Sequence, residues 1–522
     1  MIRLFSLAVI VATLSGIVSA VIGPFAVLPI VNAIIAPDGH SRHATLAGGT
    51  FPGPLITGNK GDHFKIKVTN ELVDQSMDLV TSIHWHGLFQ KDTNYADGAA
   101  FVTQCPIVPF ESFLYQFNTE EQAGTYWYHS HFQAQYCDGL RGPLVIYDPN
   151  DPHLGLYDVD DESTVITLAD WYHYVSTVAP LITEPDSTLI NGKGRYKGGP
   201  PTAFEVVNVV HGERYRLRLV SISCEPAYKF SVDRHSLTII EVDGINVKPL
   251  EVDSLQIFAG QRYSVVLNAN QPIKNYWIRA LPNYPVQDYS NYTNVAILRY
   301  SSAPISSPQG DPNKDVPQRN NPLKETNLHP LDPNPVPGKP FPGGADITIN
   351  LDVGFTLAPE PAYLVNNATF TSPSIPVLLQ ILSGKRNASD LLPKGTIYGL
   401  EAGKSVEISI PAGAPGGPHP MHLHGHSFHV VRSAGNSTYN FDNPIIRDVV
   451  SIGDPGDNVT IRFFTDNPGP WFLHCHIDWH LERGFAVVFA EDVPDVASQV
   501  KPTVDWGLLC PAYNQFNPKE EN

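Results

Sequence analysis

The sequence predicts an all-β protein of about three domains. Its 522 residues exceed the length of one ordinary domain, and 42% of them are hydrophobic, which is enough for several cores. Short runs at 64–68, 214–219 and 460–463 alternate polar and apolar residues or are rich in β-formers. Glycine (40) and proline (47) are frequent, as expected for many turns, whereas long amphipathic helical periods are scarce. Repeated short strands joined by turns favour β-sandwiches or barrels.

The first 20 residues have the pattern of a secretory signal. Arg3 supplies the positive start, residues 4–18 are largely apolar, and the small residues at 18–20 suit a cleavage site. A membrane anchor is the alternative, but the apolar part is short and interrupted. No later stretch is long and apolar enough to span a bilayer. We therefore expect a secreted, extracellular protein whose mature chain starts at Val21.

Two changes in composition divide the mature chain. A break rich in proline and aspartate at 148–152 marks the end of a first domain. Residues 301–345 hold 11 prolines and few apolar runs, as in an extended connector. We expect a signal peptide at 1–20 and domains at 21–151, 152–320 and 321–522.

The net charge excludes some classes of partner. It is −18 for the whole chain and −19 without the leader, which has one Arg and no acidic residue. A strongly acidic protein repels nucleic acid and anionic membranes, so we expect neither as a partner. The charge suits a soluble secreted protein that works in an acidic medium.

The segment His474–His480, with the sequence HCHIDWH, carries the strongest chemical signal. On a β-strand, neighbouring side chains point to opposite faces, so Cys475 would point away from His474 and His476. Three consecutive residues can then serve two metal sites. A thiolate with histidine suits a blue-copper electron-transfer site, and the imidazole pair suits a second copper centre.

Three more segments repeat this pattern: His84-Trp85-His86, His129-Ser130-His131 and His419-Pro420-Met421-His422-Leu423-His424. Together with the first segment they hold ten of the 20 histidines. A single H-x-H pair is compatible with two surface histidines, but four clusters, one with a cysteine, are hard to explain without metal. Zinc is the chemical rival, although zinc sites rarely need ten ligands in one chain.

The segments H-W-H-G, H-S-H, H-P-M-H-L-H and H-C-H-I-D-W-H-L-E resemble the four copper-binding motifs of the multicopper oxidases. The match is close to the fungal, basidiomycete-type laccases, and it extends from residues 22–24 to 510–511. The resemblance implies three consecutive cupredoxin-like Greek-key domains and four copper ions, one type 1, one type 2 and two type 3. It implies oxidation of phenols and aromatic amines coupled to reduction of O2 to water, with a role in lignin degradation or detoxification of phenolics. We also expect a monomer.

The resemblance assigns the copper ligands by position. The type 1 site would use His419, Cys475 and His480, with Ile477 and Phe485 at its axial positions. The type 2 copper would use His84 and His422, and the two type 3 coppers would use His86, His129 and His476, and His131, His424 and His474. These motifs fall only in the outer two domains, so the trinuclear centre should lie between them. Phe485 offers no thioether, so we expect a medium-to-high reduction potential. His426 and His429 lie off the pattern and are interpreted as structural residues or as supports of the ligands.

Further residues are assigned to proton transfer and to binding of the electron-donating substrate. Asp97 resembles the family carboxylate that assists proton delivery near the type 2 copper, and Asp478 is a second candidate. His480 is expected to face the solvent and receive the donor's electron. Glu225 matches the acidic residue of the laccase pocket, where a carboxylate can accept a phenol's proton. Ile182, Tyr284 and Pro418 are wall residues by alignment. Arg483 stands where a small residue is expected, and its effect stays open.

Four cysteines remain beside Cys475, and secretion permits them to form disulfides. Four cysteines allow three pairings, which the residues alone do not distinguish. The resemblance implies Cys105–Cys510 and Cys137–Cys224. The candidate N-glycan sites are Asn291, Asn367, Asn387, Asn436 and Asn458.

Other functions are weighed beside the laccase. A ferroxidase needs several acidic residues around the blue-copper histidines, and Glu225 is the evident one. Relatives that oxidise ascorbate or bilirubin carry Met where Phe485 stands. A non-catalytic electron-transfer protein would need only the blue site, and a zinc-binding structural protein would be colourless.

Overall fold

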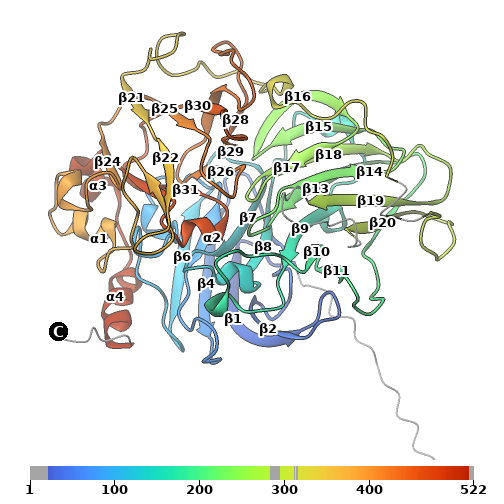
Figure 1. The fold of residues 1–522 in the computed structure, drawn as a ribbon, viewed down its shortest axis with the longest axis horizontal. Helices are drawn as coiled ribbons and strands as arrows, with labels where there is room; N and C mark the ends of the chain where they lie inside the picture. The colour runs from blue at the N-terminus through green and yellow to red at the C-terminus, as the bar shows by residue number, and fades with distance from the viewer. Residues whose placement is uncertain (1–20, 283–293, 311, 313–315, 517–522) are drawn as a thin grey trace, which may run out of the picture.

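The structure, a computed structural model, describes residues 21–282, 294–310, 312 and 316–516. The predicted signal peptide, Tyr284 and Asn291 lie outside these described residues. Three β-rich blocks follow one another along the chain, from blue through green to red in Figure 1. The all-β prediction is confirmed, because sheets dominate each block and the described part of the chain holds four short α-helices.

The N-terminal block consists of two four-stranded sheets with the orders β2-β1-β4-β6 and β3-β8-β7-β5. The predicted strand at 64–68 lies within β4, where Phe64, Ile66 and Val68 are buried and the intervening lysines are exposed. The bounds are β1 (Phe25–Ile35), β2 (Arg42–Ala47), β3 (Ile56–Asn59), β4 (His63–Glu71), β5 (Ile83–His86), β6 (Ser112–Asn118), β7 (Gly124–Ser130) and β8 (Arg141–Tyr147).

The middle block has a seven-stranded sheet, β11-β10-β9-β13-β18-β15-β16, and a five-stranded sheet, β12-β20-β19-β14-β17. The predicted strand at 214–219 lies within β13. The strands of the middle block are β9 (Val165–Trp171), β10 (Ser187–Ile190), β11 (Lys193–Tyr196), β12 (Val206–Val209), β13 (Arg214–Ser221), β14 (Tyr228–Val232), β15 (Leu237–Val242), β16 (Ile245–Val252), β17 (Leu255–Ile257), β18 (Arg262–Asn268), β19 (Asn275–Pro282) and β20 (Val295–Tyr300).

The C-terminal block has two five-stranded sheets, β21-β25-β30-β27-β28 and β24-β32-β31-β26-β29, and the hairpin β22-β23. The predicted strand at 460–463 lies within β30. The strands of the C-terminal block are β21 (Ile347–Asn350), β22 (Val353–Thr356), β23 (Ala362–Val365), β24 (Ile397–Leu400), β25 (Ser405–Pro411), β26 (Pro420–Leu423), β27 (Phe428–Arg432), β28 (Ile446–Arg447), β29 (Val449–Ser451), β30 (Asn458–Phe464), β31 (Gly469–Cys475) and β32 (Ala486–Glu491).

Helices are confined to short segments around the sheets. The α-helices are α1 (Val377–Leu382), α2 (Asp478–Leu481), α3 (Val493–Gln499) and α4 (Val504–Phe516). Single turns of 3-10 helix are η1 (Asn94–Ala96), η2 (Gln135–Asp138), η3 (Leu154–Leu156), η4 (Glu162–Thr164), η5 (Ser176–Val178), η7 (Glu325–Asn327) and η8 (Ala388–Asp390). None of the described helices is long and apolar enough to cross a membrane.

The described residues of the proline-rich segment 301–345 lie between the middle and C-terminal blocks. Between β20 and β21 they contain one named element, η7. The connector is held by specific contacts, since His329 Nδ1 lies 2.9 Å from Asn443 O and Glu325 pairs with Arg447 at 2.6 Å. Lys248 N–H of the middle block also donates to His329 O at 2.9 Å, so the connector lies against both of the blocks that it joins.

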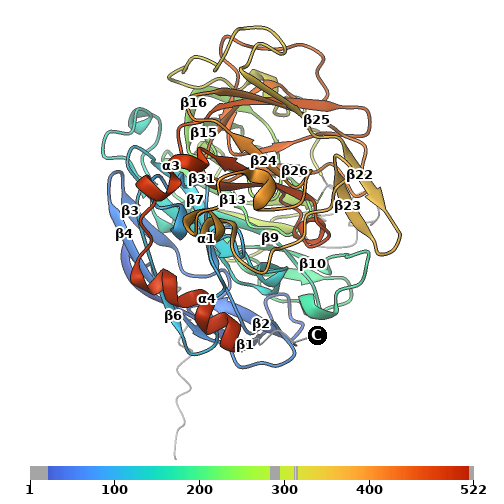
Figure 2. The same cartoon turned by 90° about the vertical axis from the view of Figure 1, so that its left-hand side faces the viewer.

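The two ends of the chain are tied together. Figure 2 shows α4 lying along the N-terminal strands, beside β6. Trp506 Nε1 donates to Thr103 O at 3.0 Å, and Cys105 forms a disulfide with Cys510. A second disulfide, Cys137–Cys224, joins η2 to the loop between β13 and β14. Both pairings are those that the resemblance implies, and each links two different blocks.

Candidate metal centres

A cysteine and two histidines meet beside the end of β31. Cys475 is the last residue of β31, His480 lies in α2, and His419 directly precedes β26. Cys475 Sγ lies 3.7 Å from Nδ1 of each histidine, and the two Nδ1 atoms are 3.1 Å apart. A sulfur and a nitrogen that bind one ion at about 2.3 and 2.0 Å in a trigonal site stand about 3.7 Å apart. The three atoms therefore fit one small metal ion.

Eight further histidines gather between the N-terminal and C-terminal blocks. His84 on β5 is the cross-strand partner of His129 on β7, and His422 on β26 is the partner of His474 on β31. Pairing within each block thus aligns the H-x-H motifs. Ligand atoms of histidines from both blocks come together in three groups, which are His84, His86 and His422; His86, His129 and His476; and His131, His424 and His474. His474 and His476 belong to these groups, whereas Cys475 belongs to the other one.

The hydrogen bonds of these imidazoles point their remaining nitrogens at one another. Nδ1 contacts an oxygen in His84, His129, His422 and His474, and in each case the oxygen is a backbone carbonyl. The Nε2 atoms then meet, with His84 3.4 Å from His422 and His424 3.1 Å from His474. Two nitrogens that bind one ion at about 2.0 Å in a tetrahedral site stand about 3.3 Å apart.

Two buried polar atoms without a hydrogen-bond partner support the same fit. One is His129 Nε2, the nitrogen on the far side of the ring from its bond to Ser130 O. The other is Asp97 Oδ1, which lies 3.3 Å from His84 Nδ1, an atom already hydrogen-bonded to Asp97 O. A buried polar atom without a partner is costly, and a bound metal or a metal-bound water would satisfy both atoms. The donor set, imidazoles with one thiolate, is that of copper proteins.

Burial keeps the imidazoles neutral, which is the form that binds metal. It lowers the pKa of His86, His129, His422, His424 and His474 well below the ordinary value, and neighbouring imidazoles add to the effect. Burial also lowers the pKa of His131 and of His476 to about 3 and that of His419 to about 4. Burial raises the pKa of the Cys475 thiol, so its ionisation requires a compensating cation.

The two aspartates singled out in the sequence have different surroundings. Asp97 accepts at its carbonyl from His84 Nδ1 at 2.8 Å, and its Oδ2 lies 2.9 Å from His424 Nδ1. Asp97 therefore orients one histidine of the N-terminal block and one of the C-terminal block. Asp478 lies against a disulfide instead, with its N–H donating to Cys224 O at 3.0 Å and Oδ2 3.7 Å from Cys137 Sγ. Burial raises the pKa of Asp478 well above the ordinary value.

The middle block also contacts the histidines, which the sequence did not indicate. Gly260 has a φ of +83°, and a Cβ there would lie 2.8 Å from His476 Cδ2 and 3.0 Å from His86 Cε1. Arg262 pairs with Asp448, whose Oδ1 lies 3.3 Å from His86 Nε2. The sequence gives no signal for these residues, because Arg262 and Asp448 lie 186 residues apart and meet only in the folded chain.

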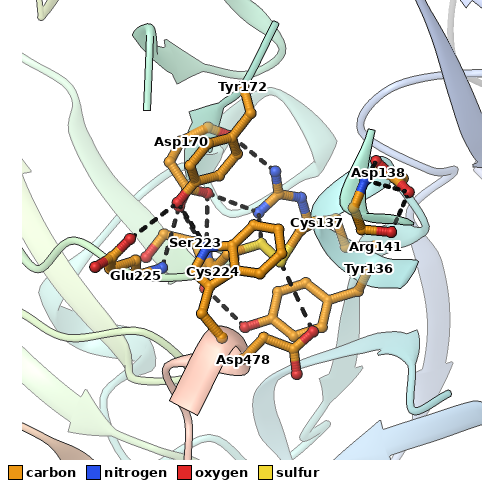
Figure 3. The surroundings of a disulfide bond; sticks show 12 residues. Tyr136, Cys137, Asp138, Arg141, Asp170, Tyr172, Ser223, Cys224, Glu225 and Asp478 are labelled. Atoms are coloured by element: carbon orange, nitrogen blue, oxygen red, sulfur yellow. Dashed lines mark hydrogen bonds and ion pairs between the residues drawn. A yellow bond between two sulfur atoms is a disulfide. The ribbon is translucent and has the colours of Figure 1, made fainter. Parts of the chain in front are cut away.

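Glu225 is buried, with 6% of its surface exposed. Figure 3 shows it beside the Cys137–Cys224 disulfide, together with Asp170, Tyr172 and Arg141. Thr183 Oγ1 donates to Glu225 Oε2 at 2.8 Å, and Tyr172 Oη lies 3.4 Å from the same oxygen. Glu225 is thus held by hydroxyl groups of the segment between β9 and β10.

The expectation that His480 faces the solvent is wrong, because its exposed fraction is 6%. Tyr363 packs against the ring with centroids 4.6 Å apart, and a Cβ on Gly416 would lie 2.8 Å from His480 Nε2. Ile182, by contrast, is 66% exposed, and Pro418 is half-buried. The ring of His480 therefore lies just beneath the surface, under a glycine-containing loop.

The axial positions and Arg483 complete these surroundings. Ile477 and Phe485 are both buried, and Phe485 stacks on Tyr363 at 5.0 Å and lies edge-on to His419 at 5.1 Å. Arg483 donates from Nη1 to Trp479 O at 2.8 Å. Burial, His419 and the positive charge of Arg483 lower the pKa of His480. Arg483 also lines a cavity of about 640 Å³ that reaches His131.

His426 and His429 lie outside the metal groups, in agreement with their interpretation as structural. His426 Nε2 lies 2.8 Å from Glu491 Oε2, and His429 Nε2 lies 3.3 Å from Asn334 O. Both line a cavity of about 920 Å³ between the three blocks.

Comparison with known proteins identifies relatives over nearly the whole chain. Residues 30–151, 162–303 and 370–495 match family models described as multicopper oxidase. The chain is 58% identical over 500 residues to Laccase-2 of Trametes versicolor, covering 95% of each chain. It is 55% identical over 520 residues to a laccase of Phlebia radiata, covering 99% of each.

Solved structures have the same fold. Fet3p, a multicopper oxidase that functions in iron import, superposes with a TM-score of 0.83 at 29% identity, covering 94% of this chain and 95% of that one. The laccase of Botrytis aclada gives a TM-score of 0.80 at 31% identity, covering 96% and 94%.

Proposed function

The chain belongs to the multicopper oxidase family, and we propose that its donor site divides the work between His480, which receives the electron, and Glu225, which receives the proton. The activity is that of a laccase, which oxidises phenolic substrates with O2. We extend the donors to aromatic amines. The observation that carries the proposal is the meeting of Cys475, His419 and His480 beside three groups of histidines.

Each metal ion has a proposed set of ligands. His419, Cys475 and His480 would hold the type 1 copper, and His84 and His422 the type 2 copper. His86, His129 and His476 would hold one type 3 copper, and His131, His424 and His474 the other. When bound, the four coppers supply storage of single electrons and the four-electron reduction of O2 to water. The distances of 3.1–3.7 Å within these sets support the assignment.

The chain itself supplies the connection between the two centres. Cys475 is bonded directly to His474 and His476, so one covalent segment joins the donor side to both type 3 sets. His480 lies beneath the surface with its ring against Tyr363. We propose that the exposed Ile182 and the half-buried Pro418 form part of the rim over which the donor approaches, and Tyr284 belongs to the same proposal.

Glu225 takes the proton that a phenol loses on oxidation. A phenol gives up an electron more easily if a base removes its proton at the same time. Glu225 is buried next to the segment that carries Ile182, and its peptide neighbour Cys224 accepts a hydrogen bond from Asp478, two residues before His480. A carboxylate at this place serves phenols but is not needed by a donor without a proton to lose.

Asp97 would serve the protons consumed in making water. Its contacts with His84 and His424, and its buried Oδ1 without a hydrogen-bond partner, support this role. Asp478 lies against the Cys137–Cys224 disulfide, so its contacts favour a part in fixing α2 rather than in proton delivery.

Secretion and processing complete the proposal. The pattern of the leader and the two disulfides support export. We propose domains at 21–151, 152–320 and 321–522. Glycans are favoured at Asn367 and Asn387, which are exposed, over the half-buried Asn436 and Asn458.

The test compares Glu225→Gln with the wild type on two donors, a methoxyphenol and ferrocyanide, which has no proton to lose. We expect kcat/KM for the phenol to fall about 100-fold. The value for ferrocyanide should stay the same or rise, because a negative charge is removed. Equal losses on both donors would refute the role of Glu225. An absorption band near about 600 nm and a copper content of four would show that the variant is loaded.

A further inference from the structure

We infer that Thr183 and Tyr172 are positioning residues for Glu225, and that their hydroxyl groups set the pH range in which the enzyme oxidises phenols. The inference rests on the proposed role of Glu225 as proton acceptor. It adds two residues of the middle block, both in or next to the segment between β9 and β10, to the determinants of the donor reaction.

Thr183 supports the ionised form of Glu225. Its Oγ1 donates to Glu225 Oε2 at 2.8 Å, and both side chains are buried. A hydrogen bond from a neutral hydroxyl to a carboxylate favours the charged form, and it does so more strongly where water is excluded. The preceding residue, Ile182, is 66% exposed. The same short segment thus presents an apolar side chain to the donor and a hydroxyl to the base.

Tyr172 supports the protonated form. Its Oη receives a hydrogen bond from Trp479 Nε1 at 3.1 Å and donates to Asp170 Oδ2 at 2.9 Å. A tyrosine hydroxyl has one proton, so with that proton directed to Asp170 it presents a lone pair to Glu225 Oε2, 3.4 Å away. Once Glu225 has accepted a proton, it can donate to this lone pair. The two hydroxyls therefore contact one carboxylate oxygen and favour opposite charge states.

The backbone around Glu225 is fixed to the helix that carries His480. The Asp170 carboxylate accepts hydrogen bonds from the N–H groups of Cys224 and Glu225 at 2.9 and 3.1 Å. Its negative charge is balanced by Arg141, whose Nη1 lies 3.0 Å from Asp170 Oδ1. Figure 3 shows this arrangement around the disulfide. Asp478, two residues before His480, donates its N–H to Cys224 O at 3.0 Å, and Trp479 Nε1 donates to Tyr172 Oη at 3.1 Å. These two bonds connect the helix of His480 to the residues on either side of Glu225.

The acid limit of phenol oxidation should follow Glu225 rather than its neighbours. Burial raises the pKa of Tyr172, Tyr174 and Tyr363, so these phenols stay protonated under acidic conditions. Among the described residues, the other charged or titratable groups near the site include Asp170 with Arg141, Glu184 and Asp186 in the segment after β9, and Cys475, Asp478, His480 and Arg483 on the side of the candidate metal ligands. All of these groups are retained in the variants below.

The experiment measures kcat/KM for a methoxyphenol against pH in Thr183→Val, Thr183→Ser and the wild type. The acid limb of the profile is the fall in kcat/KM towards low pH. Because Thr183→Val loses a hydrogen bond to a charged group, its acid limb should lie about one pH unit higher than that of the wild type. Thr183→Ser keeps the hydroxyl and should restore the wild-type limb. Thr177→Val is the matched control, because that hydroxyl lies on the same segment but donates to Ser76 O at 2.8 Å.

The variant Tyr172→Phe provides a second, independent test. It removes the acceptor of the protonated form, so its acid limb should move to lower pH, opposite to that of Thr183→Val. The pH profile for ferrocyanide should be the same in all variants, and the band near about 600 nm reports that each has folded and loaded.

The outcomes distinguish failure of the positioning roles of Thr183 and Tyr172 from failure of the role of Glu225 itself. If Glu225→Gln weakens phenol turnover selectively but Thr183→Val keeps the wild-type acid limb, the positioning role is overturned and the role of Glu225 stands. If Glu225→Gln affects both donors equally, the role of Glu225 itself fails. A shift of Tyr172→Phe in the same direction as Thr183→Val would overturn the role assigned to Tyr172.

Discussion

Arg262 donates two hydrogen bonds to Asp448, at 2.6 and 2.7 Å, and so joins the middle block to the histidine groups. Asp448 in turn lies 3.3 Å from His86 Nε2 through Oδ1 and accepts from His422 Nδ1 at its carbonyl, at 2.9 Å. Each ring is thereby left with its other nitrogen directed at a neighbouring imidazole. A carboxylate behind a metal-binding histidine fixes its tautomer and orientation.

Replacement of Asp448 by Asn should weaken O2 reduction selectively. The variant keeps the size of the side chain but loses the charge that pairs with Arg262, so the orientation of His86 is less well fixed. Loss of such a partner typically costs about 10–100-fold in metal affinity or activity. We expect O2 uptake to fall by that factor while the band near about 600 nm remains, since Cys475 and its partners are separate. Asp466→Asn is the control, at an exposed carboxylate. An O2 uptake equal to the wild type would contradict this role.

Replacement of Phe485 by Met should lower the reduction potential of the blue site. Phe485 is buried against Tyr363 and His419, so the position can present a thioether to the metal ligands. A thioether stabilises the oxidised ion. If the oxidised state gains tenfold, the potential falls by about 60 mV for one electron. A redox titration of the band near about 600 nm measures it, with Phe485→Leu as a control for volume. An unchanged potential would count against a role of Phe485.

Replacement of Asp78 by Asn should stabilise the protein near neutral pH. Burial, with the charge of Asp138, raises the pKa of Asp78 to about 6. The unfolded chain releases this proton near about pH 4, so the folded state binds more protons between these values and stability falls as pH rises. Above about pH 6 the variant should gain about 1–2 kcal/mol, allowing for partial exposure. Calorimetry from pH 4 to 7 checks this. The gain should vanish at pH 4, and the exposed Asp332→Asn should show none.

The grouping of the candidate metal-binding residues was predictable because each motif is local. H-x-H and H-C-H spacings specify which side chains share a direction, and cross-strand partners such as His84 with His129 follow once the strands pair. The strands at 64–68, 214–219 and 460–463 were predictable for the same reason.

Residues that act across blocks were not predictable from spacing. Arg262 and Asp448 are 186 residues apart, and nothing near either position indicates the other. The burial of His480 was also missed, because it depends on Gly416 and Tyr363 from another part of the C-terminal block. Thr183 was overlooked beside Ile182, since a single threonine in a loop has many ordinary uses.

The Cys105–Cys510 bond spans 405 residues and ties the end of the chain to the N-terminal block, while the three candidate groups of histidines draw on both the N-terminal and the C-terminal block. A ribosome adding about 5–20 residues per second needs roughly 20–80 s to make that interval. During this time His84, His86, His129 and His131 emerge without their partners and present half of a binding site. The complete set of imidazoles exists only once synthesis has almost ended. An ion can therefore be held by ligands from both blocks only after the histidines at 419–424 and 474–480 have been made.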